Sequence, residues 1–484
     1  MKNYHKSEEY GVLAPGADIY LMGICGTGMA ALAGLLKEKG FKVRGSDSAS
    51  YPPMGKLLHD LGIPFSIGYD EKNLEPPPQL VVIGNVITKK NPEARYVLTH
   101  SIPHISFPHA MADFFLKDRT SLVVAGTHGK TTVSSMLTSV LDKAGLDPGF
   151  MIGGILKEYK AGFRAGSPPY FVMEGDEYDT AFFDKSPKFL HYRPEAAILT
   201  SIEYDHADIY PDLESVKSAF FNFVSIIPEH GTLVACRDWE LVDEAAWKAK
   251  CRVVTYGKSR DSMWRLVSHN ITPSGTEFEV MKGGSFWGQA FVPLPGRHNA
   301  LNALSVIALS HTLGLEKDKI LSGISSFKGV MRRQEERGEA GGVTVIDDFA
   351  HHPTSVGVTL EAIKEKYDGR RLIAVFEPRT NTSRRRVFQE VYPASFSHAD
   401  VILIREVPDP EKAPPGDLFS VEKLAEDLRK MGKPAEFYPD ATAIINKLLS
   451  ICRKGDVVAV LSNGAFENIH ERLIEALKGK GRDI

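Results

Sequence analysis

The sequence of 484 residues predicts an α/β protein with three domains, from its length, its alternating pattern and two glycine-rich turns. Short apolar runs alternate with segments of helical periodicity along most of the chain, a pattern typical of βα units that build parallel sheets. Each glycine-rich turn follows an apolar run and starts a helix, as phosphate-binding turns do. We expect the domains to span residues 1–116, 117–331 and 332–484.

The composition excludes several classes of protein. The 58 basic and 61 acidic residues nearly balance, so neither nucleic acid nor a membrane surface is expected as the main partner. No apolar run approaches the roughly 18 residues that a membrane-spanning helix needs, and we expect a cytoplasmic protein. The four cysteines form no CxxC pair and indicate neither a zinc site nor a disulfide framework.

The stretch SLVVAGTHGKTT, residues 121–132, predicts a strand, a tight turn and the start of a helix. In this interpretation Lys130 neutralises the outer phosphates of a nucleotide and the Thr131 hydroxyl reaches Mg²⁺. The spacing is shorter than in GxxxxGK[ST], and an ordinary turn with a solvated lysine is the alternative. The residues predicted to bind ATP here are Gly126, Thr127, His128, Gly129, Lys130, Thr131 and Thr132.

The first glycine-rich turn, residues 23–28, follows an apolar strand at residues 19–22 and matches GxGxxA. This pattern predicts a ligand with a pyrophosphate, and a nicotinamide or flavin dinucleotide fits it as well as a UDP-sugar does. The next strands lead to an acid, Asp47, and an amide, Asn85, and we expect both side chains at the same crevice. The predicted substrate-binding residues of this domain are Gly23, Gly26, Gly28, Asp47 and Asn85.

Acidic residues follow two further apolar strands. Glu174 comes directly after the strand YFVM, and His206 lies in the cluster EYDHAD after a strand at residues 196–202. The carboxyl ends of parallel strands meet at one edge of a sheet, so these side chains are predicted to hold a nucleotide-bound metal. For His206 alone, a surface histidine is an equally good interpretation.

The rest of the chain predicts a β excursion and a further βα domain. The excursion covers residues 252–291, and PGRHN at residues 295–299 then opens a helix that offers Asn299 to a nucleotide base. The last domain begins near Arg332. Its strand at residues 343–346 leads into the loop DDFAHHP, and its tail predicts an amphipathic helix at residues 466–477.

The chain resembles the Mur ligase family in ordered agreement over nearly its whole length. The matching stretches are GICGTGMAALAG, GSD, AGTHGKTT, IEYDHAD, PGRHNALNA, the Arg332–Arg333 pair, DDFAHHPT and SNGAFENIHERL. The resemblance implies a three-domain Mur ligase architecture: a Rossmann-like UDP-binding domain, a central P-loop ATPase domain and a C-terminal Rossmann-like domain for the amine substrate. It also favours a UDP-sugar over NAD, and a ligase over a dehydrogenase or a nucleotide-binding regulator.

The resemblance implies roles for matching residues, with ATP as co-substrate and Mg²⁺ as the metal. The implied catalytic residues are Lys130, Glu174, His206 and His352. The implied metal ligands are Thr131, Glu174 and His206, and the further ATP contacts are Asn299, Arg332 and Asp347. For His352, which lies beside His351, a proton acceptor and a histidine packed only for structure are equally good interpretations.

The resemblance is strongest to the branch that joins UDP-N-acetylmuramate to the tripeptide L-alanyl-γ-D-glutamyl-meso-diaminopimelate in murein recycling. Three stretches favour this branch: YPPM, FFDKSPKFLHYRP and EPRTNT. The branch that adds L-alanine to UDP-N-acetylmuramate is the alternative. The implied reaction activates the substrate carboxylate as an acyl phosphate, which the amine then attacks.

We also predict a peptide site after the strand at residues 372–376. Arg379 there suits a carboxylate, and Asn381 and Thr382 suit a peptide backbone, and a pairing of Arg379 with a surface acid is the less favoured alternative. Two departures from the family pattern bear on the chemistry. Phe221 stands where some members carry a carbamylated lysine, so no carbamate is predicted, and Phe349–Ala350 replaces the Tyr–Gly of the alanine-adding branch.

Overall fold

The computed structural model describes residues 13–50 and 52–480, so Tyr51, the first residue of YPPM, lies outside the described residues. Contacts divide the chain into two compact units. The first unit comprises residues up to 203 with 214–264 and 305–323, and the second comprises residues 204–213, 265–304 and 324 onward. The loop at residues 204–213, which contains His206, therefore belongs to the second unit and not to the first.

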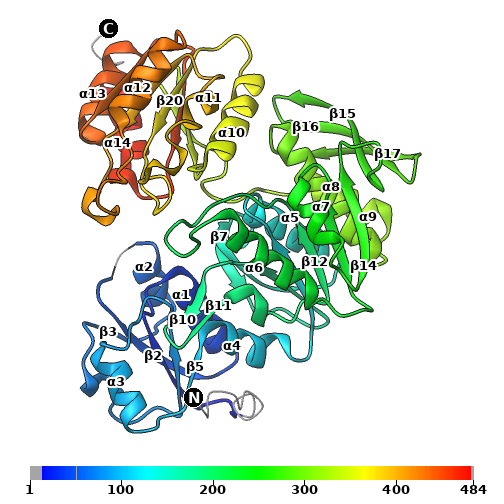
Figure 1. Ribbon diagram of the computed structural model, residues 1–484, viewed down its shortest axis with the longest axis vertical. Helices are drawn as coiled ribbons and strands as arrows, with labels where there is room; N and C mark the ends of the chain where they lie inside the picture. Colours follow the sequence, from blue (N-terminus) through cyan, green and yellow to red (C-terminus); the bar gives the residue numbers. More distant parts are fainter. Residues whose placement is uncertain (1–12, 51, 481–484) are drawn as a thin grey trace. The chain divides into compact units, whose positions relative to one another are not determined.

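The first unit begins with a parallel sheet in the order β3-β2-β1-β4-β5 (blue in Figure 1). Its strands are β1 (Asp18–Met22), β2 (Lys42–Asp47), β3 (Phe65–Ile67), β4 (Leu80–Ile83) and β5 (His104–Ser106). Its helices are α1 (Thr27–Glu38), α2 (Met54–Asp60), α3 (Pro92–Thr99) and α4 (Phe107–Met111). The central strands β1 and β4 are apolar and buried, as strands covered on both faces are. The order reverses between them, which places a ligand crevice at their carboxyl ends.

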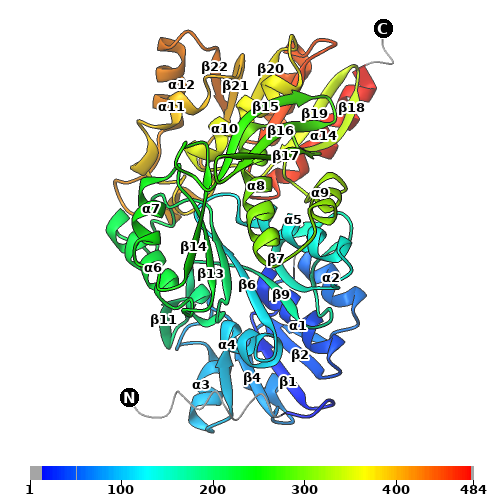
Figure 2. The same cartoon turned by 90° about the vertical axis from the view of Figure 1, so that its right-hand side faces the viewer.

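The same unit contains a larger sheet in the order β14-β13-β12-β6-β9-β7-β8, which Figure 2 shows with β14, β13, β6 and β9 side by side. Its strands are β6 (Thr120–Ala125), β7 (Gly149–Leu156), β8 (Ala161–Arg164), β9 (Tyr170–Glu174), β12 (Ala196–Leu199), β13 (Thr232–Cys236) and β14 (Arg252–Gly257). All neighbours are parallel except β8, which is antiparallel to β7. The helices are α5 (Lys130–Lys143), α6 (Leu213–Ser225) and α7 (Glu240–Ala246), and a hairpin of β10 (Asp179–Ala181) and β11 (Asp184–Pro187) precedes the short helix η4 (Lys188–His191).

The predicted β excursion, residues 252–291, begins too early, because residues 252–257 form β14 of the parallel sheet. The excursion consists of three strands, which lie in the second unit from Arg265 onward. They are β15 (Trp264–Thr272), β16 (Gly275–Lys282) and β17 (Ser285–Val292), and the helices α8 (Arg297–Thr312) and α9 (Lys317–Ser325) follow them. Among the described residues, no helix combines the length and the apolar character required to cross a bilayer.

The rest of the second unit is a sheet in the order β18-β19-β23-β20-β21-β22, parallel except for β18. The strands are β18 (Glu335–Ala340), β19 (Val343–Asp348), β20 (Leu372–Phe376), β21 (Val401–Arg405), β22 (Ala435–Tyr438) and β23 (Val457–Leu461). One core packs α10 (Pro353–Lys366), α11 (Tyr392–Ser395) and α12 (Val421–Lys430) on the sheet, and another packs α13 (Ala441–Ile451) and α14 (Ile469–Lys480). Helices α10 and α14 lie on opposite sides of β20 in Figure 1.

Two predicted boundaries in this unit are wrong. Strand β19 continues to Asp348 because Asp347 and Asp348 pair with Val460 and Leu461 of β23, so Asp347 lies at a strand end and not in a loop. The tail helix starts at Ile469, three residues later than predicted. Residues 466–468 all have positive φ angles, which an α-helix does not accept.

Candidate active site

A cavity of about 380 Å³ lies within the first unit, between the two glycine-rich turns. The turn after β1 contributes Gly23, Gly26 and Gly28, and the loop after β4 contributes Asn85. Lys130 at the start of α5 and Glu174 at the end of β9 line the same cavity. The structure thus brings together most of the residues predicted for the UDP-sugar and two of those predicted for phosphate transfer.

The second glycine-rich turn requires glycine at two positions. Gly126 has a φ of +132°, and a Cβ on it would lie 2.2 Å from the Thr200 hydroxyl oxygen. Gly129 has a φ of +80° and precedes the first residue of α5. Both conformations are open to glycine and strained for residues with a side chain. The turn after β6 therefore forms as the sequence predicts.

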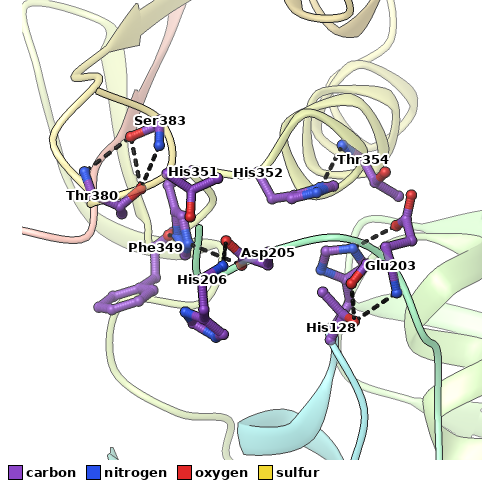
Figure 3. Close-up of polar contacts among 12 residues, drawn as sticks. His128, Glu203, Asp205, His206, Phe349, His351, His352, Thr354, Thr380 and Ser383 are labelled. Carbon is purple, nitrogen blue, oxygen red and sulfur yellow. Dashed lines mark hydrogen bonds and ion pairs between the residues drawn. The ribbon is translucent and has the colours of Figure 1, made fainter. Parts of the chain in front are cut away.

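The backbone of this turn is held from the end of β12. The N–H groups of Thr127 and His128 donate to the carbonyl and hydroxyl oxygens of Ser201, each at 2.9 Å. The His128 ring also lies 2.6 Å from a Glu203 carboxylate oxygen (Figure 3). Two of the N–H groups predicted to bind phosphate are therefore engaged within the protein. The first N–H groups of an α-helix have no partner within the helix, so the first turn of α5 is the place where this turn can bind an anion.

Lys130 lies across the turn in a largely buried position. Its ammonium group donates to the Gly126 carbonyl at 2.6 Å and to the Glu177 carboxylate at 2.9 Å. Burial by itself lowers the pKa of Lys130, but Glu177, followed by Glu174 and Asp176, raises it above the usual value. Lys130 therefore carries a fixed positive charge, and Glu177, which is 3% exposed, is its partner. The sequence places Glu177 only among the acids after β9 and does not indicate this pairing.

Thr131 and Glu174 form a second polar pair at the cavity. The Thr131 hydroxyl donates to one Glu174 oxygen at 2.9 Å, and the Gly153 N–H donates to the other at 2.8 Å. A hydroxyl and a carboxylate are oxygen ligands of the kind that Mg²⁺ prefers. These two predicted ligands fit the ion, whereas the third, His206, belongs to the other compact unit.

A lysine that the sequence does not single out lines the cavity as well. Lys188 of η4 donates to Asp176 at 2.6 Å, and both residues face the cavity. Burial raises the pKa of Asp176, but Lys188 more than offsets this effect and the pKa falls to about 2. The position of Lys188 in FFDKSPKFLHYRP is the signal that could have identified it.

Asp47, predicted to bind substrate, is not among the residues that line this cavity. It is 6% exposed, and its carboxylate accepts the Cys25 N–H at 2.8 Å and the Ser48 N–H at 2.7 Å. In this structure Asp47 holds the first glycine-rich turn in shape.

In the second unit, the loop with His206 is tied to the loop after β20. The Ala207 N–H donates to the Thr382 hydroxyl at 3.2 Å, and the Asn381 amide donates to Asp208 at 2.8 Å. His206 itself has a φ of +55°. Thr382, which is 2% exposed, and Asn381 are thus engaged with the chain itself, although both were predicted to bind a peptide.

The two histidines before α10 differ in their contacts. His352 caps α10 by accepting the Thr354 N–H on Nδ1 at 3.2 Å, and its Nε2 lies 3.2 Å from the Tyr204 carbonyl oxygen. His351 places Nδ1 at 3.1 Å from the Phe349 carbonyl and Nε2 at 3.9 Å from Asp205, the contacts drawn in Figure 3. Burial lowers the pKa of His351 below its usual value, against the opposing effect of Asp205.

The predicted ATP contacts of the second unit lie in polar networks. Arg332 donates to Asp347 at 3.3 Å and to the Ser462 and Gly464 carbonyls, and the His470 ring also lies 3.3 Å from Asp347. Asn299 is 4% exposed, and its amide donates to the Pro295 carbonyl at 2.8 Å.

Arg379, in contrast, is exposed on the loop after β20. A Cβ at Gly464 would lie only 1.9 Å from an Arg379 guanidinium nitrogen, so the arginine lies directly against this glycine. Of the three residues predicted to bind a peptide, Arg379 is the one with a charged side chain, and the residue is exposed.

Three family models match successive parts of the chain: "Mur ligase family, catalytic domain" at residues 18–119, "Mur ligase middle domain" at 124–310 and "Mur ligase, glutamate ligase domain" at 332–464. The UDP-N-acetylmuramate–L-alanyl-γ-D-glutamyl-meso-2,6-diaminoheptandioate ligase of Escherichia coli is 39% identical over 96% of this chain and 98% of its own. The UDP-N-acetylmuramate–L-alanine ligase of Lawsonia intracellularis is 33% identical over 94% and 98%.

A solved structure agrees with these relatives. A murein peptide ligase from Psychrobacter arcticus is 32% identical and superposes with a TM-score of 0.71, over 96% of this chain and 99% of that one. Matching models follow one another from residue 18 to residue 464, and full-length relatives exceed 30% identity. The chain therefore belongs to the Mur ligase family, the ATP-dependent ligases that form amide bonds.

Proposed function

We propose that this protein joins UDP-N-acetylmuramate to the amino group of L-alanyl-γ-D-glutamyl-meso-diaminopimelate at the expense of ATP, in murein recycling. The observation that carries the proposal is the shared cavity, in which the glycine turn after β1 lies with Lys130 and Glu174. The tripeptide ligase of Escherichia coli is more similar, at 39% identity, than the L-alanine ligase of Lawsonia intracellularis, at 33%. A cytoplasmic location follows from the proposal, because ATP and UDP-sugars are supplied there.

The domains divide the substrates among them. Residues 1–116 bind the UDP-sugar through Gly23, Gly26, Gly28 and Asn85, while Asp47 holds their turn in place. Residues 117–331 bind ATP at the first turn of α5. Residues 332–484 bind the amine substrate, and Arg332 and Asp347, which are hydrogen-bonded to each other, are the ATP contacts proposed for this domain.

The first chemical step makes the substrate carboxylate reactive. Its oxygen attacks the γ-phosphorus of ATP, the bond to the bridging oxygen breaks, and an acyl phosphate and ADP result. Lys130 turns from Glu177 to the γ-phosphate and opposes the charge that develops on it. Thr131 and Glu174 would hold Mg²⁺, which neutralises phosphate charge when bound.

In the second step the amine of the peptide attacks the acyl carbon and inorganic phosphate leaves. The amine must lose a proton, and a lone pair on a histidine nitrogen can accept it. In the capping arrangement, His352 uses Nδ1 to accept from Thr354 and Nε2 to donate to Tyr204. His351 donates from Nδ1 to Phe349, which leaves a lone pair on Nε2. We therefore assign the proton acceptor to His351, and the catalytic role predicted for His352 becomes a structural one.

Arg379, an exposed residue, recognises the distal carboxylates of the tripeptide with its guanidinium. A comparison of acceptors tests the function: product formation from UDP-N-acetylmuramate and ATP is measured with L-alanine, the tripeptide and a tripeptide whose distal carboxylates are amidated. We expect strong preference for the free tripeptide in the native protein. Arg379→Ala should lower kcat/KM for the free tripeptide by 10-fold or more and should leave the amidated one nearly unchanged.

Arg386→Ala is the matched control, because Arg386 is an exposed arginine of the same segment that donates to the Leu418 carbonyl. Preference for free L-alanine would assign the protein to the alternative, the UDP-N-acetylmuramate–L-alanine ligase. If Arg379→Ala keeps the preference for the tripeptide, the proposed function stands and Arg379 is not part of the peptide site.

A further inference from the structure

Two histidines and an aspartate from separate elements meet in the first unit, and none of them belongs to the polar pairs described above. His109 lies on α4, Asp184 opens β11 and His191 ends η4. Each offers one ligand atom, and these three atoms lie within 4.8 Å of one another. Figure 1 shows α4 close to β10 and β11, the hairpin that carries Asp184.

The side chains of this cluster are oriented by their neighbours. The Ser106 hydroxyl lies 2.6 Å from Nδ1 of His109, and the Ser186 hydroxyl lies 2.9 Å from Nε2 of His191, a contact that a bound ion would replace. The Ser186 N–H and hydroxyl both donate to Oδ1 of Asp184, at 2.9 and 2.6 Å. Metal-binding histidines and carboxylates are commonly fixed in this way by a second hydrogen bond.

The geometry is close to that of a zinc site. Nε2 of His191 and Oδ2 of Asp184 are 3.2 Å apart, and two ligands on a tetrahedral Zn²⁺ are about 3.4 Å apart. The rings of His109 and His191 are 4.3 Å apart between centroids. A ligand atom of His109 lies within 4.8 Å of those of the other two residues, so a modest rearrangement would bring all three to one ion.

The donor set selects the metal. Two imidazole nitrogens and one carboxylate oxygen suit Zn²⁺, whereas Mg²⁺ prefers oxygen ligands alone. The side chains of His191 and Asp184 are 19% and 22% exposed, so an ion and a water molecule as fourth ligand can reach them.

We propose that His109, Asp184 and His191 bind Zn²⁺, and that this ion fastens the β10–β11 hairpin to α4. Residues beside these ligands line the cavity: Phe107 precedes His109 by two positions, and Lys188 and Tyr192 flank His191. A bound ion braces the wall of the cavity without taking part in phosphate transfer.

Zinc binding to the full-length protein tests the proposal. Equilibrium dialysis with Zn²⁺ is performed in excess Mg²⁺, which competes at sites built from oxygen ligands. The visible spectrum with Co²⁺ in place of Zn²⁺ reports the ligand geometry. We expect one equivalent of Zn²⁺ per chain, and binding at least 10-fold weaker in His109→Gln, Asp184→Asn and His191→Gln. Zinc should raise the melting temperature of the native protein and not of these variants.

His59→Gln is the matched control. His59 lies 3.8 Å from Asp60, as a histidine beside a carboxylate, but its side chain is 89% exposed and it is not one of the three proposed zinc ligands. It should bind zinc as the native protein does. Asp184→Asn preserves shape, so its metal-free melting temperature separates lost binding from lost folding. Native zinc affinity in all three variants, absence of saturable binding to the native protein, or loss of zinc in His128→Gln alone would overturn the proposal.

Discussion

Lys130 and Glu177 combine a structural and a chemical role in one ion pair. Replacement of Lys130 alone leaves Glu177 buried and without its cation, which costs about 3 kcal/mol or more in buried pairs. The loss of activity in Lys130→Ala therefore needs to be separated from a loss of stability. A second substitution, Glu177→Gln, separates the two effects, because it removes the buried negative charge that Lys130→Ala leaves without a partner.

We expect Lys130→Ala to lower ATP-dependent acyl-phosphate formation by about 100-fold or more, since it removes a preorganised charge beside the transferred phosphoryl group. The binding of UDP-N-acetylmuramate should be retained. Adding Glu177→Gln should restore the melting temperature and leave the activity low. Recovery of activity in the double variant, or near-native ATP turnover in the single one, would contradict the role of Lys130.

The side chain of His298 makes the stability of the second unit depend on pH. Burial, followed by the charge of Arg297, lowers the pKa of His298 from 6.5 to about 4. As the pH falls, the unfolded chain binds this proton before the folded chain does. The contribution of His298 to stability is therefore fully present above about pH 6.5 and is lost progressively down to about pH 4, by up to about 3 kcal/mol.

The melting temperature measured between pH 7 and pH 4 checks this assignment. The native protein should lose more stability over this range than His298→Asn, whose side chain does not titrate. Parallel curves for the two proteins would show that His298 is not the responsible group.

At the scale of elements, helix α1 packs against strand β8 at Gly34, and a substitution there tests how tight this packing is. A Cβ on Gly34 would lie 2.2 Å from the Phe163 ring. Alanine in place of glycine inside a helix normally stabilises by about 0.5–1 kcal/mol, but overpacking a core costs about 1–3 kcal/mol. We therefore expect Gly34→Ala to lower the melting temperature.

Gly479 in α14 is the matched control, because among the described residues no atom outside the adjacent helix backbone lies within 4 Å of a Cβ placed there. Gly479→Ala should raise or maintain the melting temperature, and Phe163→Leu should relieve the defect of Gly34→Ala. A stabilising Gly34→Ala would show that α1 is not packed tightly against the β8 side chain.

At the scale of the whole molecule, the proposed substrates should each stabilise the protein. UDP-N-acetylmuramate and ATP with Mg²⁺ bind the folded chain alone, so each should add about 2.7 kcal/mol at a ligand concentration of about 100 Kd. NAD, which fits the first glycine-rich turn by pattern only, should add none. Thermal shift assays with the three ligands check this expectation, and stabilisation by NAD alone would refute the ligase assignment.

The order of elements was predictable from the sequence because it rests on local patterns. Strand β6, the turn with Gly126 and Gly129, and helix α5 follow from an apolar run, two glycines and a helical repeat that are adjacent in the chain. The motifs also placed the chain in its family before any contact was known. Errors arose at element ends such as Asp348 and Ile469, where pairing with β23 or a positive φ decides the boundary.

The sequence by itself determined the α/β class, the two glycine-rich turns and the side chains available for phosphate and metal. Tertiary structure alone decided what those side chains contact. Ser201 takes two N–H groups of the turn after β6, Cys25 engages Asp47, Thr354 engages His352, and the loop with His206 joins the second unit. Each of these partners depends on how elements pack or chain segments turn in space. A pattern of residue types carries no information about which atoms such packing will bring within hydrogen-bonding distance.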